Sequence, residues 1–190
     1  MLTDKIATFR KVSIDQYIKD CTAIRPGVSD LKFAEEYEAI KIPSRATSGS
    51  GGYDFYLPFD IDLIPGESIV IPTGICCEIE EGYTLDIYPK SGLGFKKFTT
   101  LANTIGIIDA DYYQSSNGGH ILVKIINKGF NVEYEYRTSS NKLMEDNLIR
   151  KQGESFVQGL FHECFWATND DPSLMTIRDG GFDSTNKSNT

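Results

Sequence analysis

The sequence predicts an all-β domain that follows a short helical segment and precedes a flexible arm. From residue 40 onward, short apolar runs alternate with turn residues, which is typical of an all-β domain. The first forty residues carry a helical spacing of apolar side chains, and the last dozen are mostly small and polar. The predicted divisions are residues 1–39 (N-terminal helical addition), 40–168 (β domain) and 169–190 (flexible arm).

Composition limits the class of protein. A chain of 190 residues with 40% hydrophobic and 24% charged residues is ordinary for one globular domain. No run approaches the roughly 20 apolar residues of a membrane helix, and no signal peptide is visible, so we expect a cytoplasmic protein. The net charge of -8 disfavours nucleic acid and membranes as partners. An anionic small ligand would need a local group of cations.

The N-terminal segment predicts two helices. Ser13 and Gln16 form a capping-box pattern, and apolar side chains follow Ile14 at helical spacing. Residues 26–27 (PG) end this pattern, and Asp30 is a candidate cap for the second helix.

Seven strands are predicted after residue 40, because turn residues such as Gly, Pro and Asn separate the apolar runs. They are residues 68–71, 75–80, 84–88, 106–108, 120–127, 132–136 and 156–165.

Cysteine and histidine supply little chemistry in this chain. The four cysteines form no Cys-x-x-Cys pair and are not flanked by histidine at zinc spacing, so we expect mostly buried thiols. His120 and His162 lie inside strand-like runs and are expected to be structural.

Four local features could carry chemistry, and each has a plain structural alternative. Residues 48–52 (SGSGG) are either a linker or backbone that approaches a ligand closely. Residues 88–98 hold three lysines and no acid, which suits either a phosphate or a solvated turn. Residues 107–112 place two aspartates in an apolar run, as turn formers or as groups that deprotonate a water. Residues 178–185 suit a phosphate and a ring, or are a disordered tail.

Taken in order, these features resemble the five motifs of the trimeric dUTP diphosphatases (dUTPases). Residues 50–55 (SGGYDF) resemble the first motif, A-G-Y-D-L, and residues 88–93 (YPKSGL) resemble the second, P-R-S-G-L. Residues 103–112 (NTIGIIDADY) are close to the third motif, N-x-x-G-x-I-D-x-D-Y, which is the most specific. Residues 153–158 (GESFVQ) and 178–185 (RDGGFDST) resemble the fourth and fifth. The first forty residues are not covered.

The resemblance implies a jelly-roll-like β subunit, a homotrimer with sites shared between subunits, and hydrolysis of dUTP to dUMP and pyrophosphate with Mg²⁺. It implies that Asp109 orients and deprotonates the water that attacks the α-phosphorus, and that Asp54 supports the metal through water. The other implied substrate-binding residues are Asn103, Gly106 and Leu122 for uracil, Tyr112 for deoxyribose, Lys90, Ser91, Gly92 and Gln158 for the phosphates, and Arg178, Phe182, Ser184 and Thr185 on the arm.

Several residues depart from the family pattern. Lys90 replaces the arginine of the second motif, and Ser155 stands where the fourth motif has arginine. The loop after Tyr112 is longer than usual, so that Gly119 takes the place of the glycine that normally follows the third motif closely. Asp183 occupies a glycine position of the fifth motif. These changes affect the residues implied for triphosphate binding and leave the water-activating aspartate in place.

Two other functions stay open. Ser155 and Asp183 are compatible with a non-catalytic or weakly active member of the fold that binds nucleotide or a regulatory partner. A dCTP deaminase-like enzyme is the weaker alternative, because the strand predicted after the third motif begins HILVKI and carries no carboxylate for proton transfer.

Overall fold

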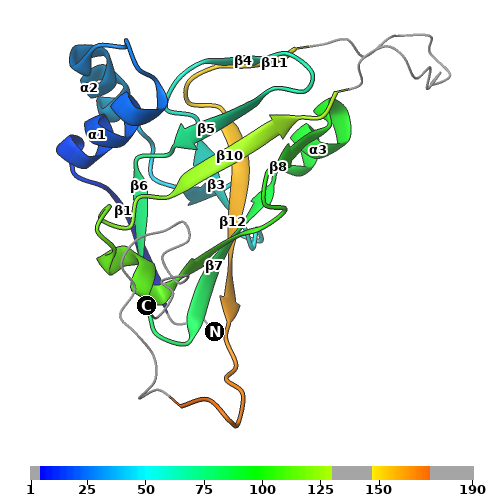
Figure 1. Ribbon diagram of the computed structural model, residues 1–190. Coiled ribbons are helices and arrows are strands. Elements are labelled where there is room, and N and C mark those ends of the chain that lie inside the picture. The colour runs from blue at the N-terminus through cyan, green and yellow to red at the C-terminus, as the bar shows by residue number, and fades with distance from the viewer. Residues whose placement is uncertain (1–4, 130–146, 172–190) are drawn as a thin grey trace, which may run out of the picture.

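β-Strands are the main regular secondary structure of the described chain, and a computed structural model places them in antiparallel sheets (Figure 1). The structure describes residues 5–129 and 147–171. Their elements, in chain order, are β1 (Ala7–Lys11), α1 (Ile14–Ile24), α2 (Asp30–Glu38), β2 (Ser44–Arg45), β3 (Tyr53–Tyr56), β4 (Ile61–Leu63), β5 (Ser68–Pro72), β6 (Ile75–Ile79), β7 (Tyr83–Pro89), α3 (Ser91–Lys97), β8 (Thr99–Leu101), β9 (Gly106–Asp109), the 3₁₀ helix η1 (Ala110–Gln114), β10 (Leu122–Asn127), β11 (Leu148–Arg150) and β12 (Ser155–Glu163).

The largest sheet within these residues has the strand order β2-β3-β12-β7-β9. A second sheet has the order β5-β10-β8, and two pairs, β1-β6 and β4-β11, complete the strands. Alternate side chains of the central strands, such as Leu85, Ile87 and Val157, are buried in one continuous core. The all-β prediction is therefore confirmed.

The N-terminal segment packs against the β body. Residues Ala7–Lys11 form a strand, so the prediction that the first forty residues are helical is wrong for them. Phe9 pairs with Cys77 on β6, and exposed and half-buried residues alternate along β1 as the period of a strand requires. Both helices lie beside each other at one end of the body, where α1 contacts β5 (Figure 1).

Both predicted helices are present and capped at their N-termini. The Ser13 hydroxyl accepts a hydrogen bond from the Gln16 backbone N–H at 3.2 Å, as the capping pattern predicts. The cap of α2 is Ser29, one residue before the predicted Asp30. The side chains of Tyr17, Cys21 and Phe33 are fully buried in the common core.

The strand predictions fall mostly on the longer strands. Those at 68–71, 75–80, 84–88, 106–108, 120–127 and 156–165 each overlap a strand, and residues 132–136 lie outside the described residues. Besides β1, the strands that the sequence did not predict have two to four residues each: β2, β3, β4, β8 and β11. Such short strands show too little alternation to predict.

The four cysteines are free thiols, and three of them are buried: Cys21, Cys76 and Cys77. Burial raises the pKa of Cys77 to about 12, so this thiol stays protonated at neutral pH and is structural. Among the described residues, no helix is both long enough and apolar enough to cross a membrane.

Candidate active site

The lysine-rich segment of the second motif forms the short helix α3, although the sequence shows no helical pattern there. Two glycines lower its intrinsic helix propensity. Leu93, which is buried, attaches the helix to the body, and Lys96 and Lys97 lie in the last turn, where the helix dipole favours positive charge. Phe98 ends the helix in the left-handed conformation with a φ of 49°.

An open groove of about 620 Å³ lies beside α3, within the usual size range of small-ligand sites. It brings together three residues implied for phosphate binding: Lys90, Ser91 and Gln158. Gly92 is exposed at the start of the helix and does not line the groove. The remaining lining residues are Tyr88, Pro89, Gly94, Phe95, Phe98 and Leu160. The groove thus combines an ammonium group, a hydroxyl and an amide with aromatic walls.

Lys90 is held at the edge of this groove by residues of the first and fourth motifs. Its Nζ donates to Oδ2 of Asp54 at 2.7 Å and to Oγ of Ser155 at 2.5 Å. The Asp54 side chain is only 16% exposed, so this ion pair is partly shielded from water. The two departures from the arginine pattern, Lys90 and Ser155, are therefore in direct contact with each other.

Strand pairing explains how the first, second and fourth motifs meet. Gln158 on β12 is opposite Asp54 on β3 and opposite Tyr88 on β7. A Cβ atom at Gly52 would lie 3.1 Å from Oε1 of Gln158, whereas Gly51 has open space around it. The glycine-rich segment therefore approaches another residue closely at Gly52.

The third motif forms a turn, the strand β9 and η1. Asn103 lies in the turn before β9, and a Cβ atom at Gly106 would lie 3.6 Å from its Nδ2. Gly106 pairs with Ile87 on β7, and Asp109 pairs with Thr84. Asp109 is half-buried at the N-cap position of η1, where its side chain makes no capping hydrogen bond.

Tyr112 is 7% exposed, and its hydroxyl is part of a local hydrogen-bond network. The hydroxyl donates to the backbone oxygen of His120 at 2.9 Å and accepts from Nδ2 of Asn117 at 2.9 Å. His120 is fully buried and hydrogen-bonded, which confirms its structural role. The strand predicted from His120 starts instead at Leu122, because residues 115–120 form a turn.

The loop after η1 depends on Gly119, which has a φ of 70° and packs against the backbone of η1. A Cβ atom here would lie 2.7 Å from Cα of Tyr113. We expect Gly119→Ala to lower the free energy of unfolding by about 1–3 kcal/mol in urea titrations. Gly118→Ala is the control, because Gly118 has a similar φ of 65° and open space around its Cβ position. Equal losses in the two variants would contradict a steric role for Gly119.

The motif residues fall into two groups on one sheet. Along β7, Tyr88 is opposite Gln158 of the groove, and Thr84 is opposite Asp109. Four residues of extended strand separate these positions by roughly 13 Å. Within the described part of one chain, the phosphate-binding candidates and the candidate base are therefore apart.

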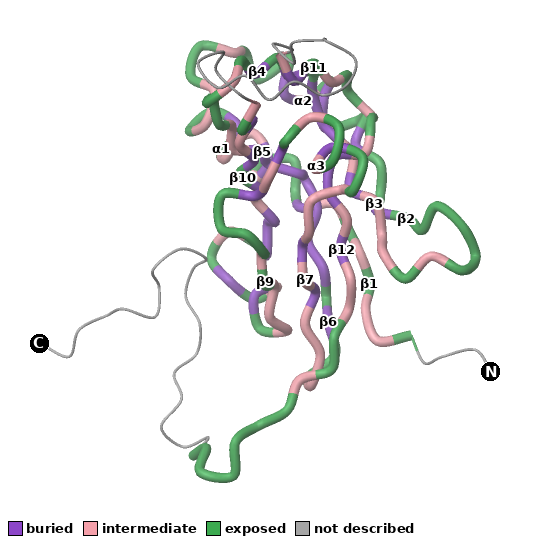
Figure 2. The backbone as a smooth tube through the Cα atoms, turned by 90° about the vertical axis from the view of Figure 1, so that its right-hand side faces the viewer, coloured by how far each residue is buried: buried purple, intermediate pink, exposed green. Residues whose placement is uncertain are grey.

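Most of the predicted C-terminal arm, residues 169–190, lies outside the described residues. Arg178, Phe182, Ser184 and Thr185 lie outside the described residues. The described chain after β12, residues 164–171, is mostly exposed and runs away from the body (Figure 2).

The all-β body, the groove with its ammonium group and the carboxylate at the end of β9 suit a β-fold enzyme that acts on a phosphorylated ligand. The family model described as dUTPase matches residues 38–138. The deoxyuridine 5'-triphosphate nucleotidohydrolase of Lactococcus lactis is 33% identical over 147 residues, which cover 77% of this chain and 88% of that protein. The chain therefore belongs to the dUTPase family.

Solved structures agree with this assignment. The dUTPase of Streptococcus mutans has a TM-score of 0.55 at 27% identity, covering 68% of this chain and 90% of the other. A single-residue variant of the dUTPase from phage phi11 of Staphylococcus aureus has a TM-score of 0.58 at 19% identity, covering 88% and 96%, and supports the fold alone. The sequence-based prediction of a jelly-roll-like dUTP diphosphatase is confirmed at the level of fold, family and enzyme class.

Proposed function

We propose that the protein hydrolyses dUTP to dUMP and pyrophosphate, with Asp109 as the general base. The observation that carries this proposal is the convergence of Lys90, Ser91 and Gln158, from two distant motifs, on one groove in a protein of the dUTPase family. The groove offers a phosphate chain several hydrogen-bond donors, among them the Lys90 ammonium group, which also pairs with Asp54. A purified chain that releases no pyrophosphate from dUTP would overturn the proposal.

In the proposed reaction, the Asp109 carboxylate takes a proton from a water molecule. The water oxygen forms a bond to the α-phosphorus, and the bond from this phosphorus to the oxygen that bridges to the β-phosphate breaks. Pyrophosphate carries away the electron pair of that bond. The position of Asp109 supports this role, because the residue is half-buried where the third motif passes from β9 into η1.

The nucleoside pocket is proposed at the turn that precedes β9. Asn103, with the backbone at Gly106 and Leu122, would hydrogen-bond the uracil edge, and the Tyr112 ring would pack on deoxyribose and exclude a 2′-hydroxyl. The contact between Asn103 and Gly106 supports a narrow pocket here. The arm residues, Phe182 over uracil and Arg178, Ser184 and Thr185 at the γ-phosphate, would complete the site.

The separation of the two groups supports a site that is shared between chains, as the proposed homotrimer would provide. Since roughly 13 Å of strand separates the groove from Asp109 within one chain, a second chain is proposed to bring its groove to the first chain's Asp109. Light scattering that finds a fully active monomer would contradict this arrangement.

Magnesium is proposed as the cofactor, held mainly by the substrate phosphates. Residues 5–129 and 147–171 contain no group of three or more His, Cys, Asp or Glu side chains that could hold a metal ion. Mg²⁺ is often bound by one or two carboxylates, waters and substrate phosphates, so Asp54 fits as a ligand through water. The dUTPase of phage phi11 coordinates a structural Mg(II) ion. When bound, the ion would offset charge on the phosphates.

Lys90 is expected to contribute to triphosphate binding more than to nucleoside binding. Lys90→Gln keeps a donor for Asp54 and Ser155 and removes the positive charge. We expect KM for dUTP to rise about tenfold, since a hydrogen bond to a charged group contributes about 1.5–3 kcal/mol, while dUMP affinity changes less. Lys96→Gln on the adjoining helix α3 is the control, because Lys96 is exposed and does not line the groove. Equal losses of affinity for dUTP and dUMP would contradict the assignment of Lys90 to triphosphate binding.

A further inference from the structure

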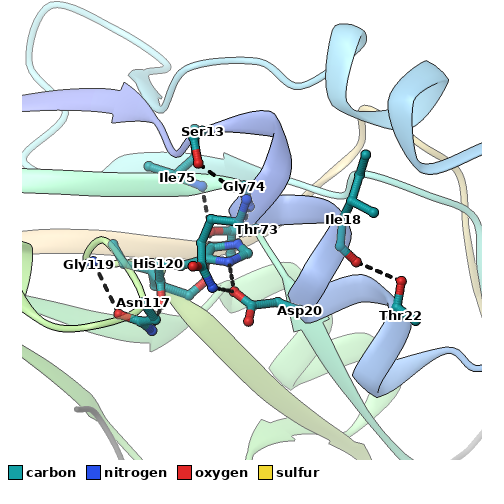
Figure 3. Close-up of polar contacts among 12 residues, drawn as sticks. Ser13, Ile18, Asp20, Thr22, Thr73, Gly74, Ile75, Asn117, Gly119 and His120 are labelled. Carbon is teal, nitrogen blue, oxygen red and sulfur yellow. Dashed lines mark hydrogen bonds and ion pairs between the residues drawn. The ribbon is translucent and has the colours of Figure 1, made fainter. Parts of the chain in front are cut away.

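Two features outside the family motifs touch each other. One is α1 of the N-terminal addition, and the other is the long loop between η1 and β10. Oδ2 of Asp20 on α1 lies 2.6 Å from Nδ1 of His120 at the end of this loop, although 100 residues separate them (Figure 3). The His120 side chain is fully buried, and that of Asp20 is 18% exposed.

The partners of His120 determine which ring nitrogen carries the proton. The backbone N–H of Gly74 donates to Nε2 at 2.8 Å, so Nε2 has no proton of its own (Figure 3). The neutral ring then carries its proton on Nδ1 and donates it to Asp20. Because both nitrogens are used, the ring is held from two sides, by α1 and by the turn before β6.

Asp20 is itself held in place for this contact. Nε2 of Gln16, one turn earlier on α1, donates to the same Oδ2 at 2.9 Å. Burial alone would raise the pKa of Asp20, but the hydrogen bonds from His120 and Gln16 outweigh it and lower the pKa below its ordinary value. Asp20 is therefore ionised at neutral pH and is a strong acceptor for the His120 proton.

The backbone carbonyl of His120 contacts the third motif through Tyr112. The carbonyl oxygen accepts from the hydroxyl of Tyr112 at 2.9 Å and from Nδ2 of Asn117 at 3.2 Å. Oδ1 of Asn117 accepts a hydrogen bond from the backbone N–H of Gly119 at 3.1 Å. Oγ of Ser115 donates a hydrogen bond to the backbone oxygen of Tyr112 at 2.7 Å. These bonds tie the loop to itself and to η1. A displacement of His120 would therefore move the anchor of the Tyr112 ring.

We infer that Asp20 is a positioning residue: by holding His120, it places the carbonyl to which Tyr112 donates, and so couples the N-terminal helix to the sugar pocket. Without Asp20, the buried Nδ1–H of His120 has no acceptor, and an unpaired buried donor is unfavourable enough to rotate the ring or admit water. The part of the inference that concerns substrate rests on the proposed function, in which Tyr112 excludes a 2′-hydroxyl.

The test compares dUTP with UTP, which differ at the sugar. Asp20→Ala is expected to lower the ratio of kcat/KM for dUTP to that for UTP by about fivefold or more, at the lower end of typical coupling between sites. Asp20→Asn keeps an acceptor oxygen but loses the negative charge, so we expect it to lower the ratio measurably, by less than Asp20→Ala does. Asp15→Ala removes an exposed carboxylate of the same helix and should leave the ratio unchanged. A general loss of stability would lower both activities together and leave the ratio constant, which would overturn the inference.

A second measurement does not depend on activity. Amide hydrogen exchange in residues 112–120 should become faster in Asp20→Ala, by about fivefold or more. Exchange in Asp15→Ala should not change. If the wild-type chain does not hydrolyse dUTP, the proposed function fails, while exchange still decides whether α1 stabilises this loop. Unchanged exchange overturns the coupling itself. If Asp20→Ala does not fold, Asp20→Asn is measured in its place, for both the dUTP-to-UTP ratio and the amide exchange. We expect smaller changes in the same direction. If neither quantity changes in Asp20→Asn, the inference is overturned.

Discussion

Replacing Asp109 with asparagine is expected to lower the turnover of dUTP by at least about 100-fold, because loss of a general base costs roughly 10²–10⁴ in rate. Asparagine has nearly the same shape, so KM should change little. The helix η1 should persist, since the Asp109 side chain makes no capping hydrogen bond to it. Steady-state release of pyrophosphate measures the effect.

Asp111→Asn is the matched control, because the sequence alone leaves open which carboxylate of the Asp-x-Asp pair acts on water. Asp111 is exposed in the first turn of η1, whereas Asp109 is half-buried at the end of β9. We expect a much smaller loss of turnover in this variant. Near-native turnover of Asp109→Asn would remove Asp109 from the proposed mechanism.

Arg25→Met is expected to lower the free energy of unfolding by about 3–5 kcal/mol, because it leaves the carboxylate of Glu36 buried without its partner. Arg25 at the end of α1 forms an ion pair with Glu36 on α2, and the Glu36 side chain is only 4% exposed. The guanidinium also lies 3.7 Å from the ring centroid of Phe59 in the β body. This pair therefore connects the two helices to the β body.

The double variant Arg25→Met with Glu36→Leu should recover much of that loss, since no charge is then left unpaired. Lys32→Met is the control within α2, because the Lys32–Glu35 pair is 56% and 61% exposed and contributes at most about 1 kcal/mol. Urea titrations of the wild-type chain and the three variants measure these differences. A double variant that is no more stable than Arg25→Met would show that the unpaired Glu36 charge is not the cause.

Sequence patterns within a few residues predicted the helices and strands whose positions depend on neighbouring residues. The Ser13 cap depends on residues three positions apart, and strands such as β5 and β6 alternate with turn residues that mark their ends. The strand β1 was missed because its sequence, ATFRK, contains no apolar run and none of its residues is fully buried. The helix α3 was missed because its glycines disfavour a helix locally, and the burial of Leu93 outweighs them.

The sequence by itself determined the all-β class, the order of the motifs and the residue types available for catalysis, because turns, alternation and motif spacing are local properties of the chain. Only the tertiary structure decided which of those residues meet. Strand pairing brings Asp54, Lys90 and Ser155 together, and it places Asp109 roughly 13 Å away along β7. Likewise, the contact between Asp20 and His120 joins residues 100 positions apart. Such contacts depend on register and on the packing of a common core, and neither is set by any short stretch of sequence.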